Sequence, residues 1–259
     1  MAESKFADGP FKLIPTPTFT QKASGAPVDG FTKAASSMAL MHNAIIRALN
    51  SVYKQAPHVE AHDYKDFISY ALHWYEILYR LKLRLDHHES EEEFFFPAIE
   101  EAAGEKGLMD VNVEQHHAFL PGLDKYKDYL LEAQKAPETF SGKKLTSIID
   151  EFGAMVCTHL EEEIPSLLEL ARLGDKVPLE ELMRVEGRKS GENNSRAGGV
   201  FYLMNIDTTF EGGLWAHWPP IPGPIRWALI TFSRWTSSVW KFASCDQSGG
   251  MVELYALRK

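Results

Sequence analysis

The chain has 259 residues, of which 44% are hydrophobic and 24% charged, a composition typical of a folded protein with a substantial core. Its formal net charge of −9 makes nucleic acids and anionic membrane surfaces poor partners. The two cysteines, Cys157 and Cys245, are too few for a disulfide framework and fit no zinc motif, which favours a reducing compartment.

The first segment, residues 1–28, is rich in proline, threonine, glycine and serine and is predicted to be an N-terminal arm. It lacks a basic start followed by an apolar run, so no signal peptide is expected. No stretch of the chain reaches about 18 uninterrupted apolar residues, and the best candidate, residues 225–243, contains three basic residues. We therefore expect a cytoplasmic protein that does not enter a membrane.

Residues 29–175 are predicted to form one all-α unit, because apolar residues recur there at helical spacing. The helices are expected at residues 30–53, 63–95, 111–134 and 142–173. Pro97 is expected to kink or end the second helix, Pro121-Gly122 to kink the third and Pro165 to bend the fourth. Four long helices joined by short connections favour a four-helix bundle.

Two further segments follow the predicted bundle. Residues 176–199 are predicted to form a short helix and then a linker, since the stretch 187–199 has the hydrophilic sequence GRKSGENNSRAGG. Residues 200–259 contain five of the six tryptophans. We interpret these last residues as an aromatic-rich C-terminal extension that packs on the bundle.

On two of the predicted helices a histidine begins an HxxxE step, in which a glutamate follows four residues later. The steps are His87 with Glu91 and His159 with Glu163. Because residues four apart lie on the same face of a helix, each step points an imidazole and a carboxylate in one direction.

A further histidine lies on the helix before each step, at similar separations of 45 residues (His42 to His87) and 43 residues (His116 to His159). The chain therefore repeats one pattern, which brings four histidines and two carboxylates to the middle of the bundle. Such polar groups are costly in a core unless they are paired. A metal ion takes neutral imidazoles and ionised carboxylates together, and a set without thiolates suits iron or manganese.

Neighbouring residues compete for these roles. Most members of the acidic runs 91–93 and 161–163 are expected to face solvent. His88 and His117 lie about 100° from the inward stripe of their helices and are expected beside the metals or at the surface. Three other residues are expected to have no ligand role: His73 in the core or a cavity, Cys157 in the core, and His217 as a contact of the extension rather than a pocket residue.

This pattern resembles the hemerythrin-like (HHE cation-binding) domain, a four-helix bundle that holds two non-haem irons. The resemblance covers roughly residues 30–174 and rests on His42 in MALMHNAIIRAL, His87-x3-Glu91 followed by Phe-Phe-Pro, His116 in EQHHAFLPGL, and His159-x3-Glu163. By matching positions, it implies that His42 and His87 serve one iron, that His116 and His159 serve the other, and that Glu91 and Glu163 bridge them. O2 is then the implied ligand or co-substrate.

The chain departs from oxygen-carrying hemerythrins at two positions. Those proteins place an additional histidine four residues before the position of His116, where this chain has Asn112. They also carry a bridging aspartate five residues beyond the last-helix histidine, where this chain has Glu163 at four residues. The incomplete ligand set disfavours oxygen storage, and the iron at His116 and His159 is expected to keep an exchangeable position.

The favoured function is an oxidase or oxygenase that acts on a small organic substrate, because two histidines and shared carboxylates leave each iron with open positions. The C-terminal extension is expected to cover an opening at Pro121-Gly122. The alternative is a protein that binds or senses O2, nitric oxide or iron without turnover. A purely structural bundle is disfavoured by six inward polar residues, and the nucleophile and phosphate-loop motifs GxSxG and GxxxxGK[ST] are absent from the sequence.

Overall fold

The computed structural model describes residues 4–78, 87–193 and 196–258. Within these ranges the chain forms helices and turns, with one isolated β-bridge between Cys245 and Met251. The predicted all-α class is confirmed. No helix in this part of the chain combines the length and the apolar character needed to cross a membrane.

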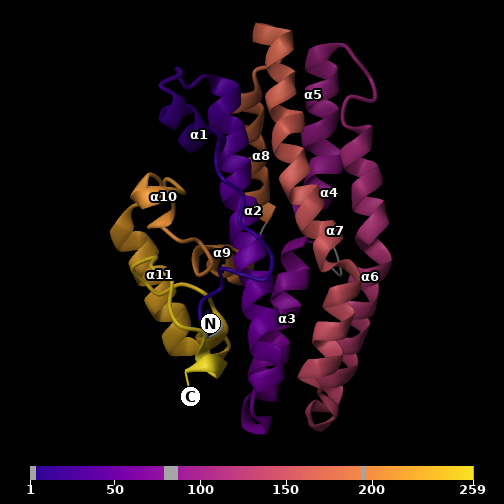
Figure 1. The fold of residues 1–259 in the computed structure, drawn as a ribbon, viewed down its shortest axis with the longest axis vertical. Coiled ribbons are helices and arrows are strands. Elements are labelled where there is room, and N and C mark those ends of the chain that lie inside the picture. The colour runs from indigo at the N-terminus through magenta and orange to yellow at the C-terminus, as the bar shows by residue number, and fades with distance from the viewer. Residues whose placement is uncertain (1–3, 79–86, 194–195, 259) are drawn as a thin grey trace.

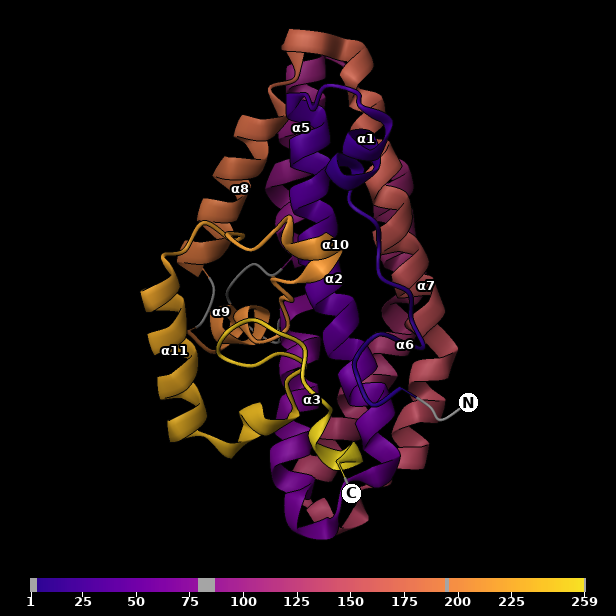
Figure 2. The same ribbon diagram turned by 60° about the vertical axis from the view of Figure 1, so that its left-hand side comes forward.

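Four helices lie side by side along the long axis of the molecule and enclose its core (Figures 1 and 2). They are α2 (Gly30–Gln55), α3 (Tyr64–Leu78), α6 (Asp110–Lys135) and α7 (Gly142–Glu169). Helix α7 packs against both α2 and α6, and α3 packs against α6. The apolar stripes of these helices, predicted from their periodicity, supply most of the buried side chains.

Two of these helices begin at residues that satisfy their first free N–H groups. The carboxylate of Asp29 accepts a hydrogen bond from the Thr32 N–H before α2, and the Ser141 hydroxyl accepts one from the Lys144 N–H before α7. Both starts match the sequence prediction. Gly174 has a φ of 56° in the turn that follows α7.

The second predicted helix is divided. Beyond α3, residues 79–86 lie outside the described part of the chain, and three segments follow: α4 (His87–Ser90), a π-helical turn (Glu91–Phe95) and α5 (Phe96–Ala103). Pro97, expected to kink or end the helix, does not end it: it lies in the first turn of α5, directly after the π-turn, where a missing N–H costs little. In the π-turn the Phe96 N–H donates to the carbonyl of Glu91, five positions earlier in the chain.

The expected opening at Pro121-Gly122 is instead a close helix contact. Pro121 lies inside α6, and a Cβ built on Gly122 would be 2.4 Å from the Cβ of Phe152 on α7. The absent side chain of Gly122 therefore lets α6 and α7 approach closely, and the helices leave no opening at this point.

A Gly122→Ala variant is expected to lower the free energy of unfolding by about 1–3 kcal/mol, because the added methyl overlaps Phe152 near its backbone. Urea unfolding of the metal-free protein measures this loss. Gly187→Ala is the matched control: nothing lies within 4 Å of its added Cβ, so stability should stay equal or rise slightly. Equal stability of the Gly122→Ala variant and the unaltered protein would contradict the close contact.

The N-terminal arm is more ordered than its composition predicts. It contains a short helix, α1 (Pro17–Ser24), and the preceding residues pack along α2. The Ile14 N–H donates to the Asn43 side chain at 2.7 Å, and the Phe11 N–H donates to the Asn50 side chain at 2.9 Å. Side-chain amides of α2 thus satisfy the backbone of the arm, a contact that composition alone does not reveal.

The predicted linker 187–199 is largely helical, which corrects the sequence prediction. Helix α8 (Leu179–Asn193) runs through its first half and α9 (Arg196–Leu203) through its second. Helix α8 packs on α2 and on the π-turn, where the Lys189 ammonium lies 4.2 Å from the centre of the Phe94 ring. Tertiary contacts of this kind override a weak local preference for helix.

The C-terminal extension packs on α2 and α3 and continues through α10 (Phe210–Gly213) and α11 (Gly223–Thr236), on one side of the molecule (Figures 1 and 2). The Tyr70 hydroxyl donates to the Asn205 side chain at 3.0 Å, and Lys241 bonds to Asp63 at 2.5 Å. These buried and half-buried contacts join the aromatic extension to the central helices.

Candidate metal centre

All six residues predicted as metal ligands are buried inside the central helices. They are His42 on α2, His87 on α4, Glu91 at the start of the π-turn, His116 on α6, and His159 and Glu163 on α7. None of their side chains exposes more than 5% of its surface. Polar groups so deeply buried require partners, and the side chains provide these for one another.

The first group consists of His42, His87 and Glu91. The Nε2 atoms of the two histidines are 3.0 Å apart, and His87 Nε2 lies 3.4 Å from one carboxylate oxygen of Glu91. Glu163 approaches from α7, with its Oε2 atom 3.3 Å from His42 Nε2. Two imidazoles and two carboxylates therefore meet at one point between α2, α4 and α7.

The second group consists of His88, His116 and His159, whose nearest ring nitrogens all lie within 4.8 Å of one another. The Nε2 atoms of His116 and His159 are 2.9 Å apart. The His88 ring stacks on His116 with 4.2 Å between ring centres, and its centre is 5.2 Å from that of His159.

His88 was expected beside the metals or at the surface, and the structure buries it completely within the second group. Successive helix residues point about 100° apart, so His87 meets His42 of α2 while His88 meets His116 of α6. His117, also next to a predicted ligand, is exposed. The angle alone did not distinguish these two histidines, because the burial of each side chain depends on which helices surround it.

Glu91 lies between the two groups. One of its carboxylate oxygens is 3.4 Å from His87 Nε2, and the other is 3.8 Å from His116 Nε2. A carboxylate with each oxygen directed to a different group has the geometry of a bridging ligand. The π-turn begins at this residue, and such turns often occur at functional sites.

The Nδ1 nitrogens of three histidines donate to oxygen acceptors, so each of these nitrogens carries a proton. His42 Nδ1 donates to the Leu160 carbonyl at 2.8 Å, and His116 Nδ1 donates to a carboxylate oxygen of Glu92 at 2.6 Å. His159 Nδ1 donates to the Gln115 side-chain oxygen at 3.0 Å. In a neutral imidazole with a protonated Nδ1, the Nε2 atom carries a lone pair and can bind a metal.

The Gln115 amide can present its oxygen to His159 because its nitrogen is engaged elsewhere. Gln115 Nε2 donates to a carboxylate oxygen of Glu162 at 2.5 Å, so Oε1 is the atom that faces His159. The Nε2 atoms of His116 and His159 therefore both carry lone pairs and face each other at 2.9 Å. Two facing lone pairs repel, so this arrangement requires a positive charge between or beside them.

Burial disfavours a proton as the source of that positive charge. Burial lowers the pKa of His159 well below its ordinary value, and burial also lowers the pKa of His116 even though the hydrogen bond to Glu92 acts to raise it. Burial likewise lowers the pKa of His87 and His88 well below the ordinary value. The imidazoles are thus held neutral, the form in which they bind metals.

A metal ion fits the donor geometry. Imidazole nitrogens lie about 2.1 Å from a bound metal ion, so two of them at right angles around one ion are about 3.0 Å apart. The Nε2 separations of His42–His87 and His116–His159, 3.0 Å and 2.9 Å, match that value. Both pairs therefore have the spacing of adjacent ligands on a single ion.

Glu163 adds a second buried carboxylate, beside that of Glu91, to the centre. Burial acts to raise the pKa of its carboxyl, and the contact with His42 acts to lower it, so that the pKa lies below its ordinary value. The carboxylate is therefore ionised inside the core, as a metal ligand must be.

The remaining sequence candidates lie elsewhere. His73 stacks on Trp240 with 5.3 Å between ring centres and bonds to Glu76 at 2.9 Å, so it joins α3 to the extension. Burial raises the pKa of the half-buried Cys157 thiol to about 12, which makes it unreactive. His217, expected as a contact of the extension rather than a pocket residue, lines a surface cavity.

Comparison with known proteins agrees with this geometry. The family model described as "Hemerythrin HHE cation binding domain" matches residues 34–171. The "Dimeric xanthone biosynthesis cluster protein R11" of Cryptosporiopsis sp. (strain 8999) is 30% identical over 254 residues, which cover 95% of this chain and 90% of that protein. No solved structure matches the chain.

Proposed function

This chain belongs to the hemerythrin HHE cation-binding family, and from that premise we propose that it is a non-haem diiron protein that binds and activates O2 to oxidise a small organic substrate. Membership of this family implies that the chain binds a cation. The number and identity of the ions, the role of O2 and the hemerythrin-like four-helix bundle that encloses them are our proposal.

The facing Nε2 atoms of His116 and His159 carry the proposal. They are 2.9 Å apart, both have their Nδ1 atoms committed as donors, and burial disfavours a shared proton. The His42–His87 pair repeats the same spacing. Two such pairs, with Glu91 directed to both, support two adjacent metal ions rather than one. A donor set of imidazoles and carboxylates without thiolate suits iron.

We assign the ligands as follows. His42 and His87 hold one iron, His116 and His159 hold the other, and Glu91 and Glu163 are shared between them. We add His88 as a third imidazole for the second iron. His88 would thus fill the position that oxygen-carrying hemerythrins give to the histidine replaced here by Asn112.

The addition of His88 changes which iron has open positions. Three imidazoles and the two shared carboxylates give the second iron five ligands, whereas the first iron has only four: His42, His87 and the same two carboxylates. Open positions are a requirement for chemistry at a metal. We therefore place the reactive position at the first iron, beside His42, and not at the second iron as the sequence indicated.

The side chains around the ligands have separate tasks. Glu92, Gln115 and the Leu160 carbonyl fix the tautomer and orientation of three imidazoles. The complete burial of the ligands keeps bulk water away from them. Two ferrous ions, when bound, supply the redox chemistry that O2 activation needs, since each can give up an electron.

The relative supports a biosynthetic role. Its name places it in a cluster for the biosynthesis of dimeric xanthones, which are aromatic compounds. Because the two chains match over almost their whole lengths, we propose that this chain also acts on a small aromatic molecule. This consideration favours an enzyme over a protein that only binds or senses O2, nitric oxide or iron.

Stopped-flow absorbance of the diferrous protein mixed with O2 tests the enzyme proposal. We expect rapid, irreversible oxidation of the iron, and steady O2 consumption once a reductant and an aromatic substrate are supplied. An O2 complex that persists for minutes and releases O2 unchanged under vacuum would favour the binding alternative and refute catalysis.

A Glu92→Ala variant is expected to bind iron about 10-fold to 100-fold more weakly, because His116 loses the acceptor that orients its ring. Competition with a ferrous chelator measures the affinity. Glu93→Ala is the control, since Glu93 is the exposed neighbour in the same acidic run. If the two variants retain iron equally, the Glu92 hydrogen bond has no role in metal binding.

A further inference from the structure

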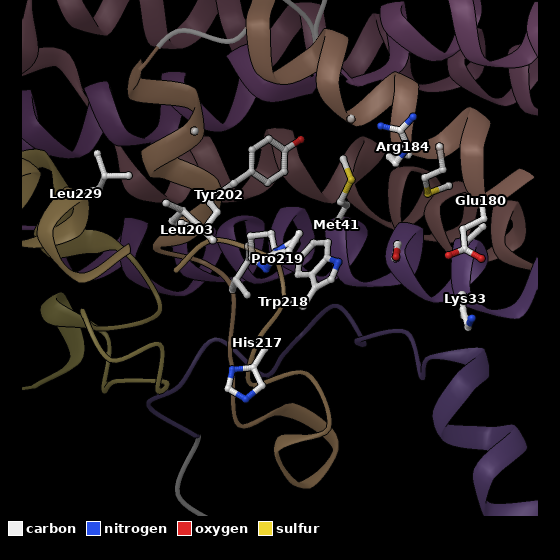
Figure 3. Close-up of a pocket in the computed structure, with 18 of the residues that line it drawn as sticks. Lys33, Met41, Glu180, Arg184, Tyr202, Leu203, His217, Trp218, Pro219 and Leu229 are labelled. Carbon is white, nitrogen blue, oxygen red and sulfur yellow. The ribbon is translucent and has the colours of Figure 1, made fainter. Parts of the chain in front are cut away.

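A large cavity lies between α2, α8, α9 and the C-terminal extension, with a volume of about 900 Å³. Cavities that bind small molecules range from about 300 to 1,000 Å³. Figure 3 shows side chains of all four segments converging on this space. Its walls come from sequence-distant segments, so the cavity exists only because the extension packs against the central helices.

Most of the cavity wall is apolar, and part of it is flat. Trp218 and Pro219 of the extension lie near Met41 of α2, with Tyr202 of α9 on another side (Figure 3). Aromatic rings and thioethers make favourable contacts with the faces of aromatic ligands. This wall therefore suits a planar aromatic molecule better than a flexible aliphatic chain.

The charged groups gather at one end of the cavity. Lys33 and Glu180 lie there together, away from the apolar Leu229 at the opposite end (Figure 3). No carboxylate lies within 4 Å of the Lys33 ammonium among the described residues, whereas the nearby Arg184 is paired with Glu181 at 2.7 Å. A phenolic hydroxyl placed between a separated ammonium and carboxylate accepts a hydrogen bond from the first and donates one to the second.

The cavity adjoins the metal centre through α2. Ser37 and Met41 of this helix face the cavity, while Met38 and His42 are buried on the bundle side. The cavity therefore reaches the residue next to a proposed ligand of the first iron. Helix α8, which forms another wall, packs on the π-turn that contains Glu91.

From these observations we infer that the cavity binds a planar, fused-ring phenol, with its rings against Trp218 and its hydroxyl between Lys33 and Glu180. The identification of this ligand as the substrate rests on the proposed function. The binding site itself rests on the cavity and its side chains and does not require the metal.

Calorimetric titration of the metal-free protein with 2-hydroxyanthraquinone tests the site. We expect this compound to bind and decanol, a flexible aliphatic alcohol, to bind at least about tenfold more weakly. Because no iron is present, this result stands whether or not the diiron proposal holds. Absence of binding, or equal binding of decanol, overturns the inference.

Two variants locate the bound molecule. Trp218→Ala is expected to weaken binding at least about tenfold, since it removes a large aromatic contact. Trp235→Ala is the matched control, because Trp235 is 82% exposed on α11 and does not line the cavity. Equal effects of the two substitutions would show that the compound binds elsewhere.

A Lys33→Gln variant tests the orientation of the bound molecule. Because the Lys33 side chain is exposed, this substitution should not change the fold. It is expected to weaken the binding of 2-hydroxyanthraquinone about threefold to tenfold, which corresponds to the loss of one hydrogen bond, and to leave the binding of unsubstituted anthraquinone unchanged. The same loss for both compounds, or no loss for either, contradicts the placement of the hydroxyl.

Discussion

A Glu91→Ala variant is expected to lose both irons, because the two oxygens of this carboxylate face different groups. They lie 3.4 Å from His87 Nε2 and 3.8 Å from His116 Nε2. Removal of a shared ligand leaves each ion short of one negative donor, and it leaves two positive charges close together with less compensation in a buried site. Iron measured per chain after purification should fall from two to near zero.

The adjacent Glu93→Ala variant separates this effect from a general change of charge. Glu93 belongs to the same acidic run and the same π-turn but is exposed, so its loss should leave two irons per chain. Circular dichroism of both metal-free variants checks that each remains folded. One retained iron in Glu91→Ala would show that the carboxylate serves a single ion and that Glu163 alone bridges.

A His88→Ala variant is expected to retain about one iron per chain. The substitution removes an imidazole from the second group, where the His88 ring lies 4.2 Å from that of His116, and leaves the first group untouched. Mössbauer spectra of the iron-57 protein should show one remaining ferrous site in place of two. This result would assign His88 to the second iron.

His117→Ala is the matched control, because both residues directly follow a proposed ligand. His117 is exposed, and its loss should change neither the iron content nor the spectrum. If His88→Ala also keeps two irons with unchanged spectra, then His88 only packs against the ligands. In that case the second iron keeps the exchangeable position expected from Asn112.

The helices and the burial of the six residues proposed as ligands could be predicted from the sequence, because both depend on local periodicity. An HxxxE step on a helix places its two side chains on one face wherever the helix lies. The repetition of the pattern at similar separations then indicated that His42 and His116 belong with the two steps. Family resemblance supplied the pairing of residues with individual irons.

His88, Glu92 and the cavity were missed because they depend on long-range packing. The position of His88 became clear only when α4 was seen between α2 and α6. Glu92 belongs to an acidic run that is ordinarily solvated, yet the π-turn directs it to His116. The segment 187–199 looked like a linker by composition, but contacts such as that of Lys189 with Phe94 hold its first half helical.

Anaerobic titration of the metal-free protein with iron-57 ferrous ion, followed by Mössbauer spectroscopy, tests the central claim most directly. We predict that the bound-iron signal increases until two ferrous ions per chain are present, and that brief exposure to O2 then converts them to a spin-coupled diferric pair with no net magnetism at low temperature. Saturation at one ion per chain, or a paramagnetic spectrum of isolated ferric ions, would contradict the diiron centre.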